Sequence, residues 1–253
     1  MKLYVSPRTP NPRRVTMFIA EKGVAGIEEV SLDLMAGQHR DPAFLDKNPM
    51  GRVPALELPD GRVLAETRAI CTYLEGLQPA PNLMGEGFEE RAFIEMADRR
   101  MELHLFMGIA NCVRHSHPAL VALENPQFPD FGAAQGAKMR ETAQWLDRLL
   151  ARQPYVAGER FTIADITTFC ALEFARGLMK YRPGAEGLEH LQAYRDRIAE
   201  RPSAIHSKEV GLGPQGRNPT TLLAWAGGVV GLRPSGYALR ANPTYARPAF
   251  YFS

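Results

Sequence analysis

The stretch NPMGRVPALELPDGRVLAETRAICTYLEGL, residues 48–77, decides the fold of the first part of the chain. It predicts a strand over 53–58, a turn at Pro59-Asp60-Gly61, a second strand over 62–65 and a helix over 66–77. Apolar residues recur along one face of that helix at the spacing of a helix that packs on a sheet. The stretch is therefore a ββα unit.

The residues before this unit predict a βαβ arrangement. Residues 2–5 and 27–32 have the composition of strands, and residues 11–23 have helical spacing with Gly23 placed to end the helix. A short helix over 41–47 follows Asp-Pro. The order βαβ-ββα predicts a thioredoxin-like domain over residues 1–78.

The second part of the chain predicts helices throughout. Residues 79–87 are rich in proline and glycine and indicate a linker. Helical patterns then cover 88–114, 134–152, 163–181 and 188–200. We therefore expect an α+β protein of two domains, with an all-helical domain over 88–205.

The last 48 residues, 206–253, differ from the rest. They contain seven glycines and five prolines and have little periodicity. This composition predicts a disordered extension or an altered end of the gene. A tail that folds over a cleft or a partner is the alternative.

Composition excludes several classes of function. The chain has 253 residues, 45% of them hydrophobic, and an overall charge of +2. Removing residues 206–253 leaves 25 basic and 27 acidic residues, so no basic surface suggests nucleic-acid binding. We see neither a signal segment nor a membrane span, and expect a soluble cytoplasmic protein. The isolated cysteines Cys71, Cys112 and Cys170 predict buried thiols rather than disulfides or a metal site.

A proline opens the first strand of the ββα unit at Val53-Pro54. On sequence grounds a trans edge-strand proline is favoured. If the bond were cis, the chain would turn sharply and leave the backbone N–H and C=O of Val53 able to pair with an extended peptide.

An acid and a hydroxyl, Glu66 and Thr67, begin the helix after the second strand. The simplest interpretation is helix capping. The same geometry offers N–H groups to a carboxylate and the Glu66 carboxylate to an ammonium, which together fit an α-amino acid head group.

Together these two motifs resemble the N-terminal domain of the cytosolic glutathione transferases. The helical half resembles the same family through the stretch 154–166, where Thr162 and Asp165 have the spacing of a capping box that we assign to folding. Arg201-Pro202 matches the usual end of the family's last helix. The resemblance covers residues 1 to about 205.

The resemblance implies that glutathione binds as co-substrate, without a metal, and that the protein is a homodimer with a role in detoxification. It places the γ-glutamyl head at Glu66 and Thr67, and the glycyl carboxylate at His39 and Arg52. Without it, His39 would be an ordinary loop residue. The glutathione-binding set implied is Asn11, His39, Arg52, Val53, Pro54, Glu66 and Thr67.

The sequence leaves more than one candidate for the group that activates the thiol of glutathione. Thr9 and Pro12 occupy the positions of a glutaredoxin-type CxxC, so exchange through protein cysteines is not expected. The run PNPRRV, residues 10–15, resembles an atypical fungal and bacterial branch in which a water held by His and Ser of the helical domain does this work. We favour His115, with Ser116, His117 and Thr9 as alternates.

Met107 and Asn111 share a helix face with His115, and with Arg14 they are the expected electrophile pocket. The alternative is that residues 111–117 are simply the polar end of a helix. His115 and His117 alone do not make a zinc site, which needs more ligands.

The function expected is conjugation of glutathione to small hydrophobic electrophiles. The alternatives are a non-catalytic glutathione- or protein-binding module on the same fold, and a glutathione-dependent reductase or peroxidase.

Overall fold

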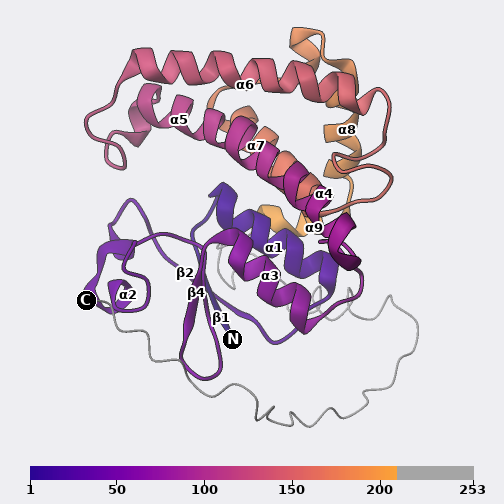
Figure 1. Cartoon of the computed structure of the whole chain (residues 1–253). Coiled ribbons are helices and arrows are strands. Elements are labelled where there is room, and N and C mark those ends of the chain that lie inside the picture. Colours follow the sequence, from indigo (N-terminus) through magenta and orange to yellow (C-terminus); the bar gives the residue numbers. More distant parts are fainter. Residues whose placement is uncertain (210–253) are drawn as a thin grey trace, which may run out of the picture. The chain divides into compact units, whose positions relative to one another are not determined.

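The computed structural model describes residues 1–209, and its first part is a four-stranded sheet with helices packed against it (Figure 1). The elements of this part are β1 (Lys2–Val5), α1 (Pro10–Lys22), β2 (Glu28–Ser31), the 3-10 turn η1 (Gln38–Arg40), α2 (Pro42–Leu45), β3 (Ala55–Glu57), β4 (Val63–Ala65) and α3 (Thr67–Leu77). The predicted βαβ-ββα order is therefore confirmed.

The pairing of the strands decides which loops meet. The strand order is β2-β1-β3-β4, with β2 parallel to β1 and the other pairs antiparallel. Tyr4 lies opposite Ala55, which in turn lies opposite Ala65. The end of β1, the start of β3 and the end of β4 therefore lie at one edge of the sheet.

Helix α1 has clear start and stop signals. Pro10 is at its first position, where a missing N–H costs nothing, and Gly23 ends it in the left-handed region with φ 65°. The Gly23 N–H donates to the carbonyl of Ala20. Val15 and Phe18 are fully buried, so this helix packs its apolar face against the core.

The second part is helical, as predicted. Its elements are α4 (Gly87–Arg100), the π-helical turn η2 (Met101–Phe106), α5 (Met107–Ser116), η3 (Pro118–Leu120), α6 (Pro129–Leu150), α7 (Ile163–Leu178), η4 (Pro183–Glu186), α8 (Glu189–Ala199), α9 (Pro202–His206) and η5 (Ser207–Glu209). The predicted helix over 88–114 is thus interrupted by a π-helical turn. Helix α6 begins five residues before the predicted start because Pro129 occupies its first turn.

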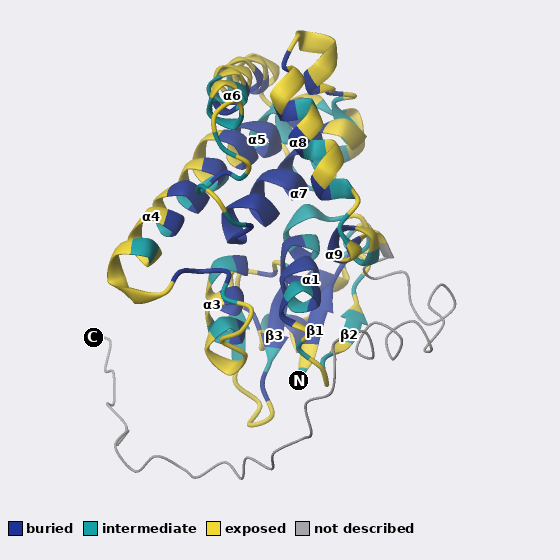
Figure 2. Cartoon of the chain, turned by 90° about the vertical axis from the view of Figure 1, so that its right-hand side faces the viewer, coloured by how far each residue is buried: buried dark blue, intermediate teal, exposed yellow. Residues whose placement is uncertain are grey.

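Helix α7 is the core of the helical part, and Figure 2 shows it buried along most of its length. The predicted capping box is present, with Asp165 accepting from the Thr162 backbone N–H at 2.8 Å. Asp165 also accepts from the Val156 N–H at 2.9 Å and the Tyr194 hydroxyl at 2.8 Å. Burial raises the pKa of Asp165 to about 6. These bonds tie α7 to α8 and to the loop before α7.

The packed chain continues beyond residue 205. Arg201 in front of α9 donates twice to Glu21 of α1, both at 2.8 Å, and Arg13 of α1 donates to Ser207 at 3.1 Å. Because Ser207 is only 2% exposed, the predicted tail boundary at 206 is a few residues early. The prediction of disorder for the remaining residues, 210–253, lies outside the described residues.

No helix within residues 1–209 has the length and apolar character needed to cross a membrane.

Candidate functional site

Two helices begin at the sheet edge where β1 and β4 end. Helix α1 starts at Pro10, shortly after β1, and α3 starts at Thr67, directly after β4. Their free N–H groups give this edge a positive potential. The β3 strand, which runs the other way, begins between them in the strand order.

Glu66 precedes α3 with an unusual backbone. Its φ of 66° lies in the left-handed region, which costs a non-glycine residue about 1–3 kcal/mol. The side chain is exposed and makes no hydrogen bond or ion pair with residues 1–209, so it does not cap the helix. Thr67, the first helical residue, is 6% exposed. The Glu66 carboxylate, which stands at a helix start and forms no ion pair with residues 1–209, is suited to an incoming ammonium group.

Behind Glu66 lies a buried ionic network that the sequence did not predict. Arg68 of α3 pairs with Glu95 and lies 3.6 Å from the carboxylate of Asp98, which is fully buried. Thr167 of α7 donates to Asp98 at 2.5 Å. The network fixes the first turn of α3 against α4 and α7. Only Arg68 adjoins the Glu66-Thr67 motif, and nothing local in the sequence marks the other members.

Arg14 belongs to the same network rather than to an open pocket. It is 1% exposed and donates to Asn11 at 3.2 Å, Glu102 at 3.1 Å and Thr167 at 2.9 Å. The expectation that Arg14 lines the electrophile pocket is corrected, since its guanidinium is enclosed between α1, η2 and α7. The side-chain oxygen of Asn11 is occupied by the same contact.

A second group of cations lies around Arg52, which precedes the start of β3. Arg52 and Arg40 are exposed and pair with no carboxylate in the described part of the chain. Burial, followed by the charges of Arg114 and Arg40, lowers the pKa of Arg52. Arg114 on α5 pairs with Glu124 at 3.3 Å and was not among the predicted site residues. Arg52 and Arg40, which form no ion pair within residues 1–209, provide positive charge suited to a carboxylate.

His39 lies beside this cationic group. It is 9% exposed, and burial, then the charges of Arg40 and Arg52, lowers its pKa, so the ring is neutral at pH 7. Its Nδ1 is buried and bonds to nothing within residues 1–209. Gly51 allows this packing, because a Cβ there would lie 2.8 Å from the His39 carbonyl oxygen.

The Val53–Pro54 bond is cis, so the trans form favoured on sequence grounds is wrong. Pro54 is buried and Val53 is half-buried. The backbone N–H and C=O of Val53 make no hydrogen bond with another backbone group of residues 1–209. They remain able to pair with an extended ligand, which was the alternative conditional on this geometry.

The candidates at the end of α5 each have one polar atom engaged locally. Nδ1 of His115 accepts from the Phe128 N–H at 3.2 Å, and its ring packs against Phe128 and Phe131. Nδ1 of His117 accepts from the Ala119 N–H at 3.2 Å, and Ser116 donates to the Cys112 carbonyl. A neutral histidine that accepts at Nδ1 carries its proton on Nε2, so each ring retains one donor.

The remaining predicted residues are partly accessible. Met107 is 40% exposed, and Asn111 and Thr9 are half-buried. The Thr9 hydroxyl donates to the Ser6 carbonyl at 2.6 Å, so its proton is committed to the loop before α1.

Two of the three cysteines are buried thiols. Burial raises the pKa of Cys71 to about 12 and that of Cys170 to about 11. Cys112 is half-buried, which corrects the expectation that all three are buried. Within residues 1–209, no group of three or more His, Cys, Asp or Glu side chains is placed to hold a metal ion.

Comparison with known proteins gives two family matches that together span most of the described chain. The N-terminal domain of glutathione S-transferase matches residues 9–77, and the C-terminal domain matches residues 118–197.

Relatives match along most of their length. Glutathione S-transferase 2 of Saccharomyces cerevisiae is 37% identical over 212 residues, which cover 83% of this chain and 90% of that protein. GstA of Escherichia coli O157:H7 is 31% identical over 68% of this chain and 81% of its own. A probable elongation factor 1-gamma of Arabidopsis thaliana is 28% identical, over 73% of this chain and 45% of that protein.

Solved structures agree with this assignment. A glutathione S-transferase domain-containing protein of Marinobacter aquaeolei VT8 superposes with a TM-score of 0.77 at 40% identity, covering 81% of this chain and 100% of that chain. Gtt2 of S. cerevisiae superposes with the same score at 36% identity, covering 82% and 100%. The identity to yeast glutathione S-transferase 2 over most of both chains, with the shared fold, shows that this chain belongs to the glutathione S-transferase family.

Proposed function

We propose that this chain conjugates the thiolate of glutathione to small hydrophobic electrophiles. The observation that carries the proposal is a pair of opposite charges at the sheet edge that form no ion pair within residues 1–209. Glu66, with its strained backbone, stands at the start of α3, and Arg52 stands before the start of β3. Glutathione has an amino acid head at one end and a carboxylate at the other, which complements this pair.

Each part of the substrate has a matching group. The ammonium of the γ-glutamyl head would pair with Glu66, and its carboxylate would accept from N–H groups at the start of α3 beside Thr67. The cysteinyl backbone would bond to the free N–H and C=O of Val53, which lies directly before Pro54 and the start of β3. The glycyl carboxylate would meet Arg52, with the neutral ring of His39 beside it.

In this arrangement the thiol would lie near the start of α1. β3 lies between β1 and β4 in the sheet. A peptide paired with Val53 therefore lies between the starts of α1 and α3. The free N–H groups of α1, which begins at Pro10-Asn11, favour a thiolate there.

Activation needs a donor as well as a helix start. Lowering a thiol pKa from about 8.5 by about two units takes roughly 2.7 kcal/mol of preferential stabilisation of the thiolate. We propose that His115 supplies part of it through its Nε2–H, acting through a water molecule, with Ser116 and His117 as alternates. Thr9 is a weaker candidate, because its proton already bonds to Ser6.

The domains would divide the work. Residues 1–78 would hold glutathione, and residues 88–205 would supply an electrophile pocket that includes Met107 and Asn111, joined by the linker at 79–87. Both pocket side chains are partly accessible on α5.

Calorimetry of glutathione binding tests the pairing of Glu66 with the ammonium group of glutathione. We expect Glu66→Ala to weaken binding by about 1.5–3 kcal/mol, the range for a lost charge-assisted bond, and Glu28→Ala, an exposed glutamate on β2, to leave it unchanged. Equal affinity in wild type and Glu66→Ala would contradict the assignment of this carboxylate.

Turnover separates conjugation from the alternatives. The second candidate is a non-catalytic glutathione- or protein-binding module on the same fold. Glutathione-dependent loss of an aryl halide with release of halide indicates conjugation. Binding without turnover indicates the binding module, and oxidation of glutathione by a hydroperoxide or disulfide indicates the reductase or peroxidase.

We also propose a homodimer. Apolar side chains stand exposed along α4 and η2, with Phe93 at 59%, Met96 at 39% and Leu103 at 51%. Beside them a groove of about 460 Å³ between η2 and α6 is lined in part by Trp145. A self-complementary contact would cover this face. Light scattering on wild type and Phe93→Glu tests this, and a wild-type monomer at micromolar concentration would contradict it.

Finally, we propose a cytoplasmic location, which the free thiols of Cys71, Cys112 and Cys170 favour. Cell fractionation tests it.

A further inference from the structure

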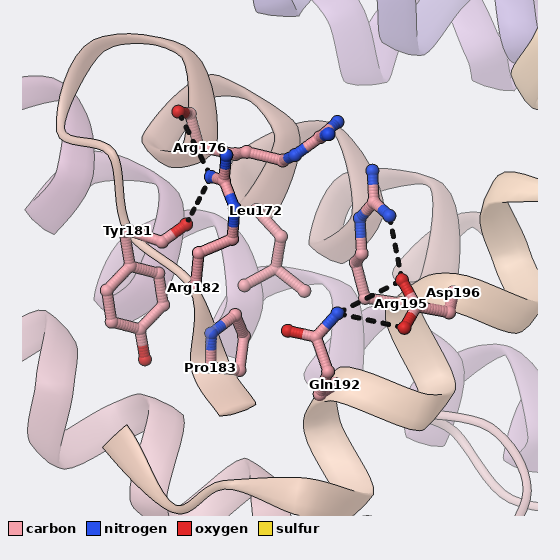
Figure 3. A pocket seen from close by; sticks show the side chains of 8 residues that line it. All are labelled: Leu172, Arg176, Tyr181, Arg182, Pro183, Gln192, Arg195 and Asp196. Carbon is pink, nitrogen blue, oxygen red and sulfur yellow. Dashed lines mark hydrogen bonds and ion pairs between the residues drawn. The ribbon is translucent and has the colours of Figure 1, made fainter. Parts of the chain in front are cut away.

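A cavity at the far end of α7 contains a concentration of arginines that the glutathione site does not use. Its volume is about 220 Å³, and it lies between the end of α7, the segment through η4 and helix α8 (Figure 3). Its lining residues are Leu172, Arg176, Tyr181, Arg182, Pro183, Gln192, Arg195 and Asp196.

The carboxylates around this cavity do not balance the arginines. Glu173 is shared, with Arg195 at 2.9 Å and with Arg13 and Arg176 each at 3.6 Å. Asp196 pairs with Arg195 at 2.8 Å. Three arginines line the cavity; Arg195 and Arg176 are paired with these carboxylates, and Arg182 is left over.

Arg182 is the uncompensated member. It donates only to backbone carbonyls, of Tyr181 at 3.2 Å and Arg176 at 3.5 Å, and pairs with no carboxylate of the described chain. Figure 3 shows its side chain at the cavity, across from Gln192 and Arg195. Because Arg182 is exposed, its remaining N–H groups are accessible to a ligand.

The one carboxylate in the lining, Asp196, accepts hydrogen bonds from two neighbours. Gln192 donates to both oxygens of Asp196, at 3.0 and 2.9 Å, and Arg195 donates to one of them. Although burial opposes it, these bonds from Gln192 and Arg195 hold the pKa of Asp196 below its usual value, so this carboxylate stays ionised and committed to its partners. An incoming anion would therefore depend on Arg182, the lining arginine that pairs with no carboxylate within residues 1–209.

We propose that this cavity binds a small tetrahedral oxyanion, a phosphate that is either free or carried by a small organic molecule. Guanidinium groups from three elements surround one space, which suits an anion with oxygens in several directions better than a flat carboxylate. Leu172, Tyr181 and Pro183 add an apolar wall that an organic group would contact. The volume is below that of cavities for drug-sized ligands, so the ligand is small.

The test is a titration of the protein with inorganic phosphate at constant ionic strength, in a buffer that contains no other phosphate. Binding is measured by calorimetry or from the ³¹P line width. Arg182→Gln removes the uncompensated charge without breaking an ion pair, so the fold is retained. Arg148→Gln, an exposed arginine of α6 outside the cavity, is the matched control. Arg52→Gln shows whether phosphate binds at the other cationic group.

We expect Arg182→Gln to weaken phosphate binding about fivefold or more, and Arg148→Gln to leave it unchanged. Phenyl phosphate distinguishes the source: tighter binding than inorganic phosphate indicates an organic phosphate, and equal binding indicates the free ion. Absence of binding up to about 20 mM, or loss in Arg52→Gln with none in Arg182→Gln, would overturn the proposal.

Discussion

Arg14 allows a sharp test, because two arginines share one carboxylate in different surroundings. Glu102 accepts from Arg14, whose side chain is 2% exposed, and pairs with Arg99, whose side chain is 42% exposed. Replacing Arg14 by Met removes a buried charge and its bonds to Asn11, Glu102 and Thr167. Breaking a buried pair costs about 3–5 kcal/mol, and we expect the lower end because Glu102 keeps its second partner.

The matched control is Arg99→Met, which removes the exposed partner of the same Glu102. Exposed pairs contribute at most about 1 kcal/mol. Urea unfolding followed by circular dichroism should give a midpoint about 1–1.5 M lower for Arg14→Met, and nearly unchanged for Arg99→Met.

Two results would refute this reasoning. Equal midpoints for the two variants would mean that the buried network around Arg14 adds nothing to stability. A normal midpoint with a fall in kcat/KM would return Arg14 to the electrophile pocket that the sequence predicted.

Three further predictions concern activation, pH and the end of the chain. His115→Ala should raise the pKa of bound glutathione, read from thiolate absorbance against pH, and lower kcat by about 10²–10³, whereas Thr9→Ala should do neither; the reverse order would assign activation to the Thr9 hydroxyl. Because the folded-state pKa of Asp165 is raised to about 6 from 3.8, its contribution to stability is complete below pH 3.8 and lost as pH rises through 6. The wild type should therefore lose about 3 kcal/mol relative to Asp165→Asn between pH 4 and 7, and parallel pH profiles of unfolding free energy would contradict this. A chain ending at Glu209 should bind glutathione as the full chain does, and weaker calorimetric affinity would show that residues 210–253 belong to the site.

Local patterns were sufficient for most of the fold. Strand alternation, helical spacing and the stop at Gly23 predicted the elements to within a few residues, because these signals act between neighbours. The same holds for Glu66, since the junction of a strand and a helix start is visible in the sequence. The π-helical turn η2 was not predicted, because its residues fit the apolar spacing of an ordinary helix.

The residues behind the site depend on partners far along the chain. Arg14 meets Glu102 and Thr167, which are 88 and 153 positions away, and no local pattern indicates such pairs. His115 was predicted from the resemblance to a branch that uses a histidine of the helical domain, together with helix-face spacing, and its contacts with Phe128 and Phe131 come from the return of the chain into α6. Tertiary structure decides these contacts, so sequence reasoning could propose the residue but not its surroundings.

The hydrogen bonds that join the segment around α9 to α1 have a consequence for synthesis of the protein. Helix α1 is among the first segments to leave the ribosome, yet the groups that cover Glu21 and Arg13 are Arg201, Ser203 and Ser207. Translation adds about 5–20 residues per second, so these groups are synthesised roughly 6–25 s after residue 77, when the sheet and α3 are already complete. During this interval the outer face of α1 is open to water and to chaperones, and the N-terminal part reaches its final packing only when the last described helix arrives.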